Sequence, residues 1–182
     1  ALTRWAATIR RVSDRTTYFN FTASHDGIGV RPTTGLLTDD EIAALVQLTL
    51  DHGGRVSFKN NPDGTQSPYE LNITYFDAIT HPEITETQPY LAVNRFICSQ
   101  AIMLSMIGVP GIYLHSLFGS QNYEAGVAET GRNRTINREK LDADLLLEAL
   151  DDPTSLRSKV FNRYQTLLAA RAEHAAFHPL GD

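Results

Sequence analysis

The amino-acid sequence predicts an α/β fold in which short strands alternate with longer helices. An apolar, β-prone run over residues 17–22 ends in His25-Asp26, and glycines 27 and 29 follow it, which is typical of a strand that delivers polar side chains to a loop. A capped helix follows over residues 38–52, and a helical apolar stripe over 88–106 leads into a second short strand. Strand followed by helix is the unit that an α/β barrel repeats.

The composition indicates one soluble globular unit. The chain has 182 residues, of which 42% are hydrophobic and 20% are charged, and this is enough to bury a core. Its formal net charge is -5, and no stripe or cluster of Lys and Arg is present to follow a phosphate backbone. We therefore expect no nucleic-acid partner, and a neutral substrate is compatible with the charge.

Cysteine usage and hydropathy favour a cytoplasmic protein without a membrane anchor. Cys98 is the single cysteine, which rules out an internal disulfide, and its place in an apolar helical pattern predicts a buried, inert thiol. The longest apolar run, residues 101–107, is far too short to cross a bilayer. Residues 1–11 are too basic at their end for a signal peptide.

The first third of the chain is predicted to contain a helix tail, the Asp26 strand and a complete helix. Apolar residues at helical spacing over 2–9 indicate a helix that begins upstream. After a loop over 27–37, Thr38 and Glu41 form a capping box at the start of the next helix, and Gly53-Gly54 ends it. The inward stripe of that helix is Ile42, Leu45, Val46 and Thr49.

The middle of the chain departs from simple strand-helix alternation. Residues 61–64, Asn-Pro-Asp-Gly, are a strong turn signal between β-prone runs at 55–60 and 69–76, and they predict a hairpin within an excursion over about 55–87. A helix is then expected over 88–106, with Val93, Phe96, Ile97, Ala101 and Leu104 facing a core.

The last third is predicted to contain one strand, one long loop and two helices. Residues 112–115 read as a short strand, and residues 116–138, which lack hydrophobic periodicity, read as an ordered loop over a site. A helix over 141–150 precedes a final helix, which should begin with Asp152 as N-cap and Pro153 at its first position and end at His178-Pro179. The buried face of the final helix is predicted to be Val160, Tyr164, Leu167 and Leu168.

Three segments in order resemble one enzyme family. Residues 19–32 closely resemble the seventh-strand motif of the α-amylase clan of retaining α-glucosidases and transglucosylases. Their Asp-Gly-Ile-Gly portion is similar to the form that this motif has in the sucrose phosphorylase branch. Residues 108–119 resemble the eighth strand and its loop in that branch, and residues 134–138 resemble its Arg-x-Ile-Asn-Arg element. The resemblance covers nearly the whole chain.

The resemblance implies that residues 1–182 are the C-terminal portion, strands 7–8 and the following helices, of a (β/α)8 TIM barrel. A complete barrel needs roughly 250 residues, so the chain would be part of a single catalytic domain, with the excursion at about 55–87 inserted. The missing N-terminal part of the barrel would then be its main partner. Because a partial barrel has open strand edges, the isolated chain is expected to self-associate, to be marginally stable, or to fold only together with the missing part of the barrel.

The implied activity is that of a glycoside phosphorylase, which transfers glucose between an α-glucoside such as sucrose and inorganic phosphate by a retaining double displacement, with no cofactor. In this clan the nucleophile and the acid/base come from strands four and five, so this segment alone should be inactive. Alternatives within the clan are glucosylglycerate phosphorylase, sucrose 6-phosphate phosphorylase and an α-glucoside hydrolase. The non-enzyme alternative is a carbohydrate-binding module.

Two residues are implied to contact the sugar. The carboxylate that matches Asp26 stabilises the oxocarbenium-like transition state, and the residue that matches His25 helps to hold the glucosyl ring. From the residues alone, an Asp that caps a turn beside a hydrogen-bonded His is the competing interpretation.

Four further residues are candidates for the acceptor side. Arg134 matches an acceptor-subsite arginine, whose guanidinium fork suits phosphate or an anionic acceptor, although a loop-stabilising ion pair is the alternative. Tyr69 and Glu70 lie where the branch has an acceptor-side loop with Tyr and commonly Gln, and the change to Glu weakens the case for fructose as acceptor. An ordinary exposed turn is the alternative for these two residues. His115 either contacts the pocket or is a hydrogen-bonded histidine at the barrel rim. His81, His174 and His178 lack metal-ligand spacing, so no metal site is predicted.

Overall fold

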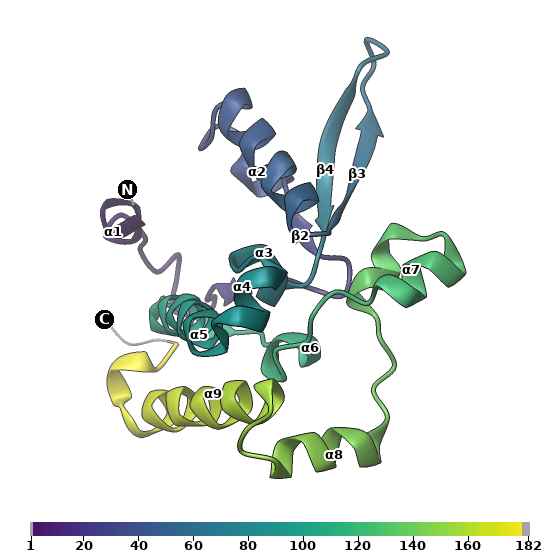
Figure 1. Cartoon of the computed structure of the whole chain (residues 1–182). Helices are drawn as coiled ribbons and strands as arrows, with labels where there is room; N and C mark the ends of the chain where they lie inside the picture. The colour runs from purple at the N-terminus through teal and green to yellow at the C-terminus, as the bar shows by residue number, and fades with distance from the viewer. Residues whose placement is uncertain (1, 180–182) are drawn as a thin grey trace.

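The computed structural model describes residues 2–179, in which two small sheets lie among helices (Figure 1). The fold class is mixed α/β, as the sequence predicts. The elements in order are α1 (Leu2–Ala6), β1 (Phe19–Asn20), β2 (Ile28–Gly29), η1 (Arg31–Thr33), α2 (Asp39–Asp51), β3 (Arg55–Asn60), β4 (Gln66–Asn72), α3 (Tyr75–Ile79), α4 (Pro82–Thr87), α5 (Pro89–Ser105), β5 (Val109–Pro110), α6 (Leu114–Leu117), α7 (Glu124–Thr130), η2 (Asn133–Asn137), α8 (Ala143–Asp151), α9 (Leu156–Glu173) and η3 (Ala175–Phe177).

The first sheet pairs β1 with β5 in parallel, although the two strands are far apart in the chain. Phe19 lies opposite Val109, and the Asn20 side chain donates a 2.8 Å hydrogen bond to the Ile107 carbonyl. Gly108 permits this close approach, because a Cβ there would lie 2.5 Å from the Tyr18 carbonyl oxygen. A parallel pair requires a long crossover, which the segment from β2 to α5 supplies.

The second sheet is antiparallel, in the order β2-β4-β3, and the predicted hairpin is confirmed. The predicted run at 69–76 is wrong at its end, because β4 stops at Asn72 and Thr74 caps α3, which begins at Tyr75. In Figure 1 the β3–β4 hairpin extends away from the helical part of the molecule. Helix α2 packs against this sheet through the predicted stripe, around the buried residues Val30, Leu71 and Ile73. Its capping box is present, because Thr38 Oγ1 accepts from the Glu41 amide at 3.3 Å and Glu41 Oε2 accepts from the Thr38 amide at 2.8 Å.

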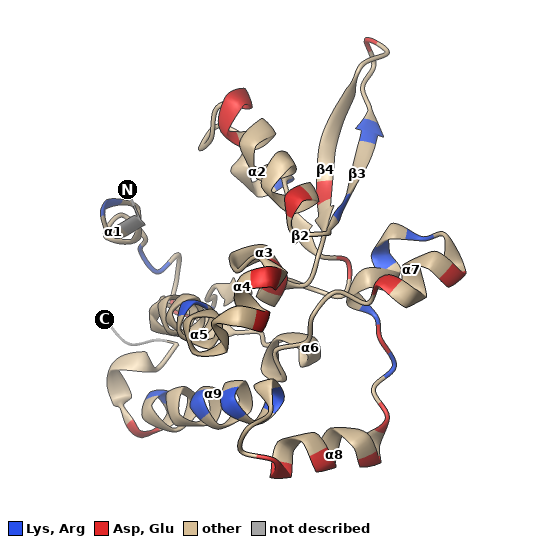
Figure 2. Ribbon diagram, viewed as in Figure 1, with Lys and Arg blue, Asp and Glu red and all other residues tan. Residues whose placement is uncertain are grey.

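The main core lies between α5 and α9. Phe76, Phe96 and Val160 are almost completely buried there, and the Tyr164 hydroxyl donates to the Gln100 side chain at 2.8 Å. Apart from the half-buried Ala101, the predicted stripes of both helices therefore face this core. Figure 2 shows basic residues along α9 and acidic residues along α8, so charges of both signs lie on neighbouring helices. Over residues 2–179, no helix is long and apolar enough to cross a membrane.

Two predictions for residues 112–138 are wrong. The second parallel strand is Val109–Pro110, and Leu114–Leu117 is helical, because the strand ends where Gly111 packs against the Phe19 ring. The segment that was expected to be a loop contains α7 and η2. Helix α7 is too short to give a recognisable periodicity. It packs closely against η2, because a Cβ at Gly126 would lie 2.9 Å from the Thr135 side chain.

Three smaller predictions are also wrong. Ser155, and not Asp152, is the N-cap of α9, because the Asp152 side chain instead accepts hydrogen bonds from Thr154 in the preceding turn. Helix α9 ends at Glu173, and η3 follows before His178. Cys98 is exposed, since it lies beside the stripe of α5 that faces the core and not on it.

Candidate functional site

Asp26 lies in a tight turn just beyond β1. Ser24 and Gly27 exchange backbone hydrogen bonds of 3.0 and 3.1 Å, and the Asp26 amide donates to Ser24 Oγ at 3.2 Å. Gly27 has φ of 117°, and a Cβ on it would lie 2.2 Å from the Leu71 carbonyl oxygen. Only glycine fits this position, and the turn therefore holds Asp26 at the boundary between the two sheets.

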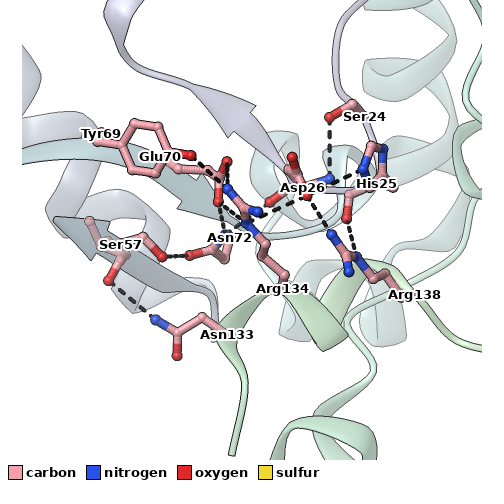
Figure 3. Close-up of polar contacts among 11 residues, drawn as sticks. Ser24, His25, Asp26, Ser57, Tyr69, Glu70, Asn72, Asn133, Arg134 and Arg138 are labelled. Carbon is pink, nitrogen blue, oxygen red and sulfur yellow. Dashed lines mark hydrogen bonds and ion pairs between the residues drawn. The ribbon is translucent and has the colours of Figure 1, made fainter. Parts of the chain in front are cut away.

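One oxygen of Asp26 faces three cationic or titratable groups. Its Oδ1 lies 2.5 Å from an Arg138 Nη2 that donates to it, 3.5 Å from Arg134 Nε and 3.4 Å from His25 Nε2 (Figure 3). Arg138 also donates through Nε to the His25 carbonyl at 3.1 Å. The Asp26 turn is thus joined to η2 by a charge-assisted pair, although more than 100 residues separate them in sequence.

Arg134 also connects η2 to the hairpin strand β4. Its Nε and Nη2 donate to the two carboxylate oxygens of Glu70 at 2.8 and 3.1 Å, and Nη2 donates to the Tyr69 hydroxyl at 2.6 Å. The hydrogen bond to Glu70 raises the pKa of Arg134 further above its ordinary value. The Glu70 side chain is only 7% exposed, so its charge is largely removed from water. The paired Arg134 guanidinium offsets the desolvation cost of that charge.

Asn72 completes the link between Glu70 and Asp26. Its Nδ2 donates to Glu70 Oε2 at 2.8 Å and to the Asp26 carbonyl at 2.9 Å, and its Oδ1 accepts from Ser57 at 2.6 Å. Glu70 and Asn72 are two positions apart on β4, so their side chains lie on one face of the strand. We call Asp26, Glu70, Asn72, Arg134 and Arg138 the polar cluster.

The structure brings together five of the six predicted site residues, namely His25, Asp26, Tyr69, Glu70 and Arg134. His115 lies apart from them. It is buried in α6, where its Nδ1 lies 2.9 Å from Ser120 Oγ and its ring packs edge-on against Tyr113. Burial lowers the pKa of His115. These contacts correspond to the alternative in which His115 is a hydrogen-bonded structural histidine and does not contact the pocket.

Sequence reasoning missed Arg138 and Asn72 as site residues. Arg138 ends the Arg-x-Ile-Asn-Arg element, so its spacing from Arg134 was an available signal. For Asn72 the available signal was its position two residues after Glu70 on a strand, which places both side chains on one face. No group of three or more His, Cys, Asp and Glu in the described part of the chain is arranged to hold a metal ion.

Known proteins resemble this chain over nearly its whole length, although no family model matches it. A glucosylglycerate phosphorylase from Spirochaeta thermophila is 51% identical over 180 residues, which is 99% of this chain. One from Escherichia coli is 45% identical over 98% of the chain. The chain belongs to the sucrose phosphorylase branch of glycoside phosphorylases. This confirms the resemblance that the three motifs indicated.

The chain spans about a third of the length of these phosphorylases, 30% and 32% of the two proteins named above. A solved phosphorylase structure has the same fold. The crystal structure of sucrose 6F-phosphate phosphorylase from Thermoanaerobacter thermosaccharolyticum superposes with a TM-score of 0.75 at 22% identity. The match covers 97% of this chain and 33% of that protein.

Proposed function

We propose that the whole protein is an α-glucoside phosphorylase and that this chain supplies the sugar- and acceptor-contacting end of its active site. The observation that carries the proposal is the polar cluster, in which an acidic residue at the end of a parallel strand is joined to two arginines and a second acidic residue. Developing positive charge on a glucosyl ring and an oxyanion that attacks it require such neighbouring charges of opposite sign.

In this proposal β1 and β5 are the seventh and eighth strands of a (β/α)8 barrel, and the chain is its C-terminal portion. Their parallel pairing supports this, as does the position of Asp26 beyond the carboxyl end of β1. The whole chain belongs to one catalytic domain. The excursion over about 55–87 then comprises β3, β4, α3 and α4, and the β3–β4 hairpin delivers Tyr69 and Glu70 to the site.

The reaction proceeds in two displacements with retention of configuration. Glucose is first transferred from the α-glucoside to a carboxylate nucleophile, and inorganic phosphate then takes it from the enzyme to give glucose 1-phosphate. The nucleophile and the acid/base belong to the part of the phosphorylases that this chain does not cover. Phosphate is a co-substrate, and the reaction uses no cofactor.

The predicted residues that meet at the polar cluster have distinct roles in this scheme. Asp26 accepts hydrogen bonds from ring hydroxyls and stabilises the transition state, and His25 holds the glucosyl ring. Arg134 binds phosphate or the acceptor beside Tyr69 and Glu70. His115 would act at most indirectly, because Ser120 and Tyr113 occupy its contacts.

The acceptor we propose is glycerate. Relatives 45–51% identical to this chain are named glucosylglycerate phosphorylases, and the arginine-bearing segment η2 suits an anionic acceptor. Glu70 in place of glutamine argues against the neutral acceptor fructose, since its carboxylate is already engaged with Arg134.

The proposal is tested by incubating the intact protein with phosphate and glucosylglycerate, sucrose or sucrose 6-phosphate, and measuring glucose 1-phosphate. We expect product from glucosylglycerate and little from the other two. Release of free glucose at the same rate without phosphate would identify a hydrolase instead. Sugar binding without turnover of any of the three would identify a binding module.

A further inference from the structure

An open cleft of about 460 Å³ adjoins the polar cluster on the side of η2. We call it the arginine cleft. Its lining residues are Ser57, Thr130, Gly131, Arg132, Asn133, Arg134, Thr135 and Arg138. Figure 3 shows Ser57 and Asn133 on one side of Arg134 and Asp26 on the other, so Arg134 lies between the cleft and the proposed sugar site. Three of the lining residues are arginines, and none is acidic.

Two of these arginines already have their charge balanced. Arg134 is paired with Glu70 at 2.8 Å, and Arg138 is paired with Asp26 at 2.5 Å. Arg132 differs from them. Its side chain is exposed, and over residues 2–179 no carboxylate lies within ion-pair distance of its guanidinium. The cleft therefore has an excess positive charge, and Arg132 is its source.

The backbone of Arg132 is nevertheless held in place. Its amide donates to Thr130 Oγ1 at 3.3 Å, and its carbonyl accepts from the Thr135 amide at 3.0 Å. Gly131 ends α7 in the left-handed conformation, with φ of 63°, which directs the chain from α7 into this turn. Because the backbone of Arg132 is already fixed, a ligand that binds its guanidinium has only the side chain to order. The cost in conformational entropy is therefore modest.

From this arrangement we infer that Arg132 binds the anionic end of the acceptor, a carboxylate or a phosphate monoester at the far end of a short hydroxylated molecule. The inference rests on the proposed function. Asp26 does not line the cleft, whereas Arg134 and Arg138 border both regions. An acceptor with its reacting hydroxyl on the Asp26 side can therefore extend its charged end into the cleft. Inorganic phosphate must itself attack the glucosyl carbon, so we place it on the Asp26 side of Arg134 and expect it not to contact Arg132.

The test compares Arg132→Gln and Arg132→Lys with the wild type in the intact protein. The KM for glycerate is measured in synthesis from glucose 1-phosphate, and the KM for phosphate is measured in phosphorolysis. A lost charge-assisted hydrogen bond corresponds to a change of about 10- to 100-fold. We expect a rise of about that size in the KM for glycerate for Arg132→Gln, a smaller rise for Arg132→Lys, and a KM for phosphate within about 2-fold of the wild type.

Two controls separate this role from a general effect of charge. Lys140→Gln removes one positive charge from an exposed residue just after η2 that does not line the cleft, and it should leave both KM values unchanged. Glycerol 3-phosphate, offered in place of glycerate, distinguishes the two oxyanions: the one that Arg132 binds loses affinity in Arg132→Gln.

The results of these measurements distinguish a failure of this inference from a failure of the proposed function. If the wild type uses neither anionic acceptor, the proposed function and this inference fail together. If the wild type uses an anionic acceptor and Arg132→Gln leaves the KM for both glycerate and glycerol 3-phosphate unchanged, only the inference is overturned. An equal rise in the KM for phosphate would also overturn it, because Arg132 would then bind the nucleophile.

Discussion

Asp26 has the proposed catalytic role, and its position depends directly on contacts within the fold. Its Oδ1 is bound by Arg138 and approached by Arg134, and Gly27 fixes its turn. We expect Asp26→Asn in the intact protein to lower kcat for glucose 1-phosphate formation by about 100-fold or more, equivalent to about 3 kcal/mol, because one preorganised group at developing charge is lost. Far-ultraviolet circular dichroism should remain that of the wild type. A folded Asp26→Asn protein with near-normal turnover would exclude the transition-state role.

Arg134 has a proposed role in the chemistry and also neutralises the buried Glu70, so its removal should have two effects. Arg134→Ala should slow the transfer of glucose from enzyme to phosphate or acceptor more than the formation of the glucosyl-enzyme from an activated donor. It should also lower stability, because Glu70 is left as an unpaired buried charge. Single-turnover kinetics of the two half-reactions would measure the first effect, and thermal unfolding the second.

The double variant Arg134→Ala with Glu70→Gln separates these effects. It should recover much of the lost stability, since no buried carboxylate remains without a partner, while the second half-reaction stays slow. Equal losses in both half-reactions for the single variant would instead indicate a purely structural role for Arg134.

At the scale of elements, a buried junction joins α2, α3 and the segment before α7. Asp77 of α3 accepts from the Asn122 amide at 2.7 Å, and its carbonyl lies 2.6 Å from His52 Nδ1. Asn122 Oδ1 accepts from the Thr74 amide at 2.9 Å, and Asn122 Nδ2 donates to the His52 carbonyl at 3.2 Å. The junction therefore sets the position of the hairpin relative to the segment that leads to η2.

Asp77 should make stability depend on pH. Burial raises its pKa from 3.8 to about 6, against the opposing hydrogen bond from Asn122. The folded state then holds the proton more tightly than the unfolded state, so the contribution of Asp77 to stability is greatest at or below pH 4 and declines as pH rises to 6. The size is on the order of 3 kcal/mol.

We expect Asp77→Asn to remove this dependence. Thermal unfolding of the intact protein between pH 4 and pH 7 should show that the melting temperature of the variant gains on that of the wild type as pH increases. His52, His81 and Glu124 lie around Asp77 and are the same in both proteins, so only the difference between the two curves is informative. Parallel curves would show that Asp77 stays ionised throughout.

At the scale of the whole molecule, the parallel sheet is incomplete in the described residues. Within residues 2–179, strands β1 and β5 pair only with each other, and each has an open edge. Phe19, in β1, is 67% exposed, and Phe21, just after β1, is 55% exposed. Open edges and exposed aromatic side chains favour association. We expect the isolated 182-residue chain to self-associate or to unfold at low temperature, and to catalyse no phosphorolysis. Sedimentation as a monodisperse monomer with cooperative unfolding would contradict this.

The sequence by itself determined features that depend on neighbours a few residues away. The capping box of Thr38 and Glu41, the turn at 61–64 and the core stripes of α5 and α9 follow from local hydrogen bonds and helical periodicity, and the structure confirms them. The three motifs likewise identified the family, because the order of residue types is itself the signal.

Only the tertiary structure decided which distant residues meet. The pairs Arg134–Glu70 and Arg138–Asp26 join positions 64 and 112 residues apart. His115 instead contacts Ser120, away from the polar cluster. No local rule predicts such pairs, since they depend on the whole path of the chain between them. Helix α7 was missed for the same reason, because a short helix is stabilised mainly by what it packs against. The exposure of Cys98 also depends on which elements cover α5, and that is a property of the assembled molecule.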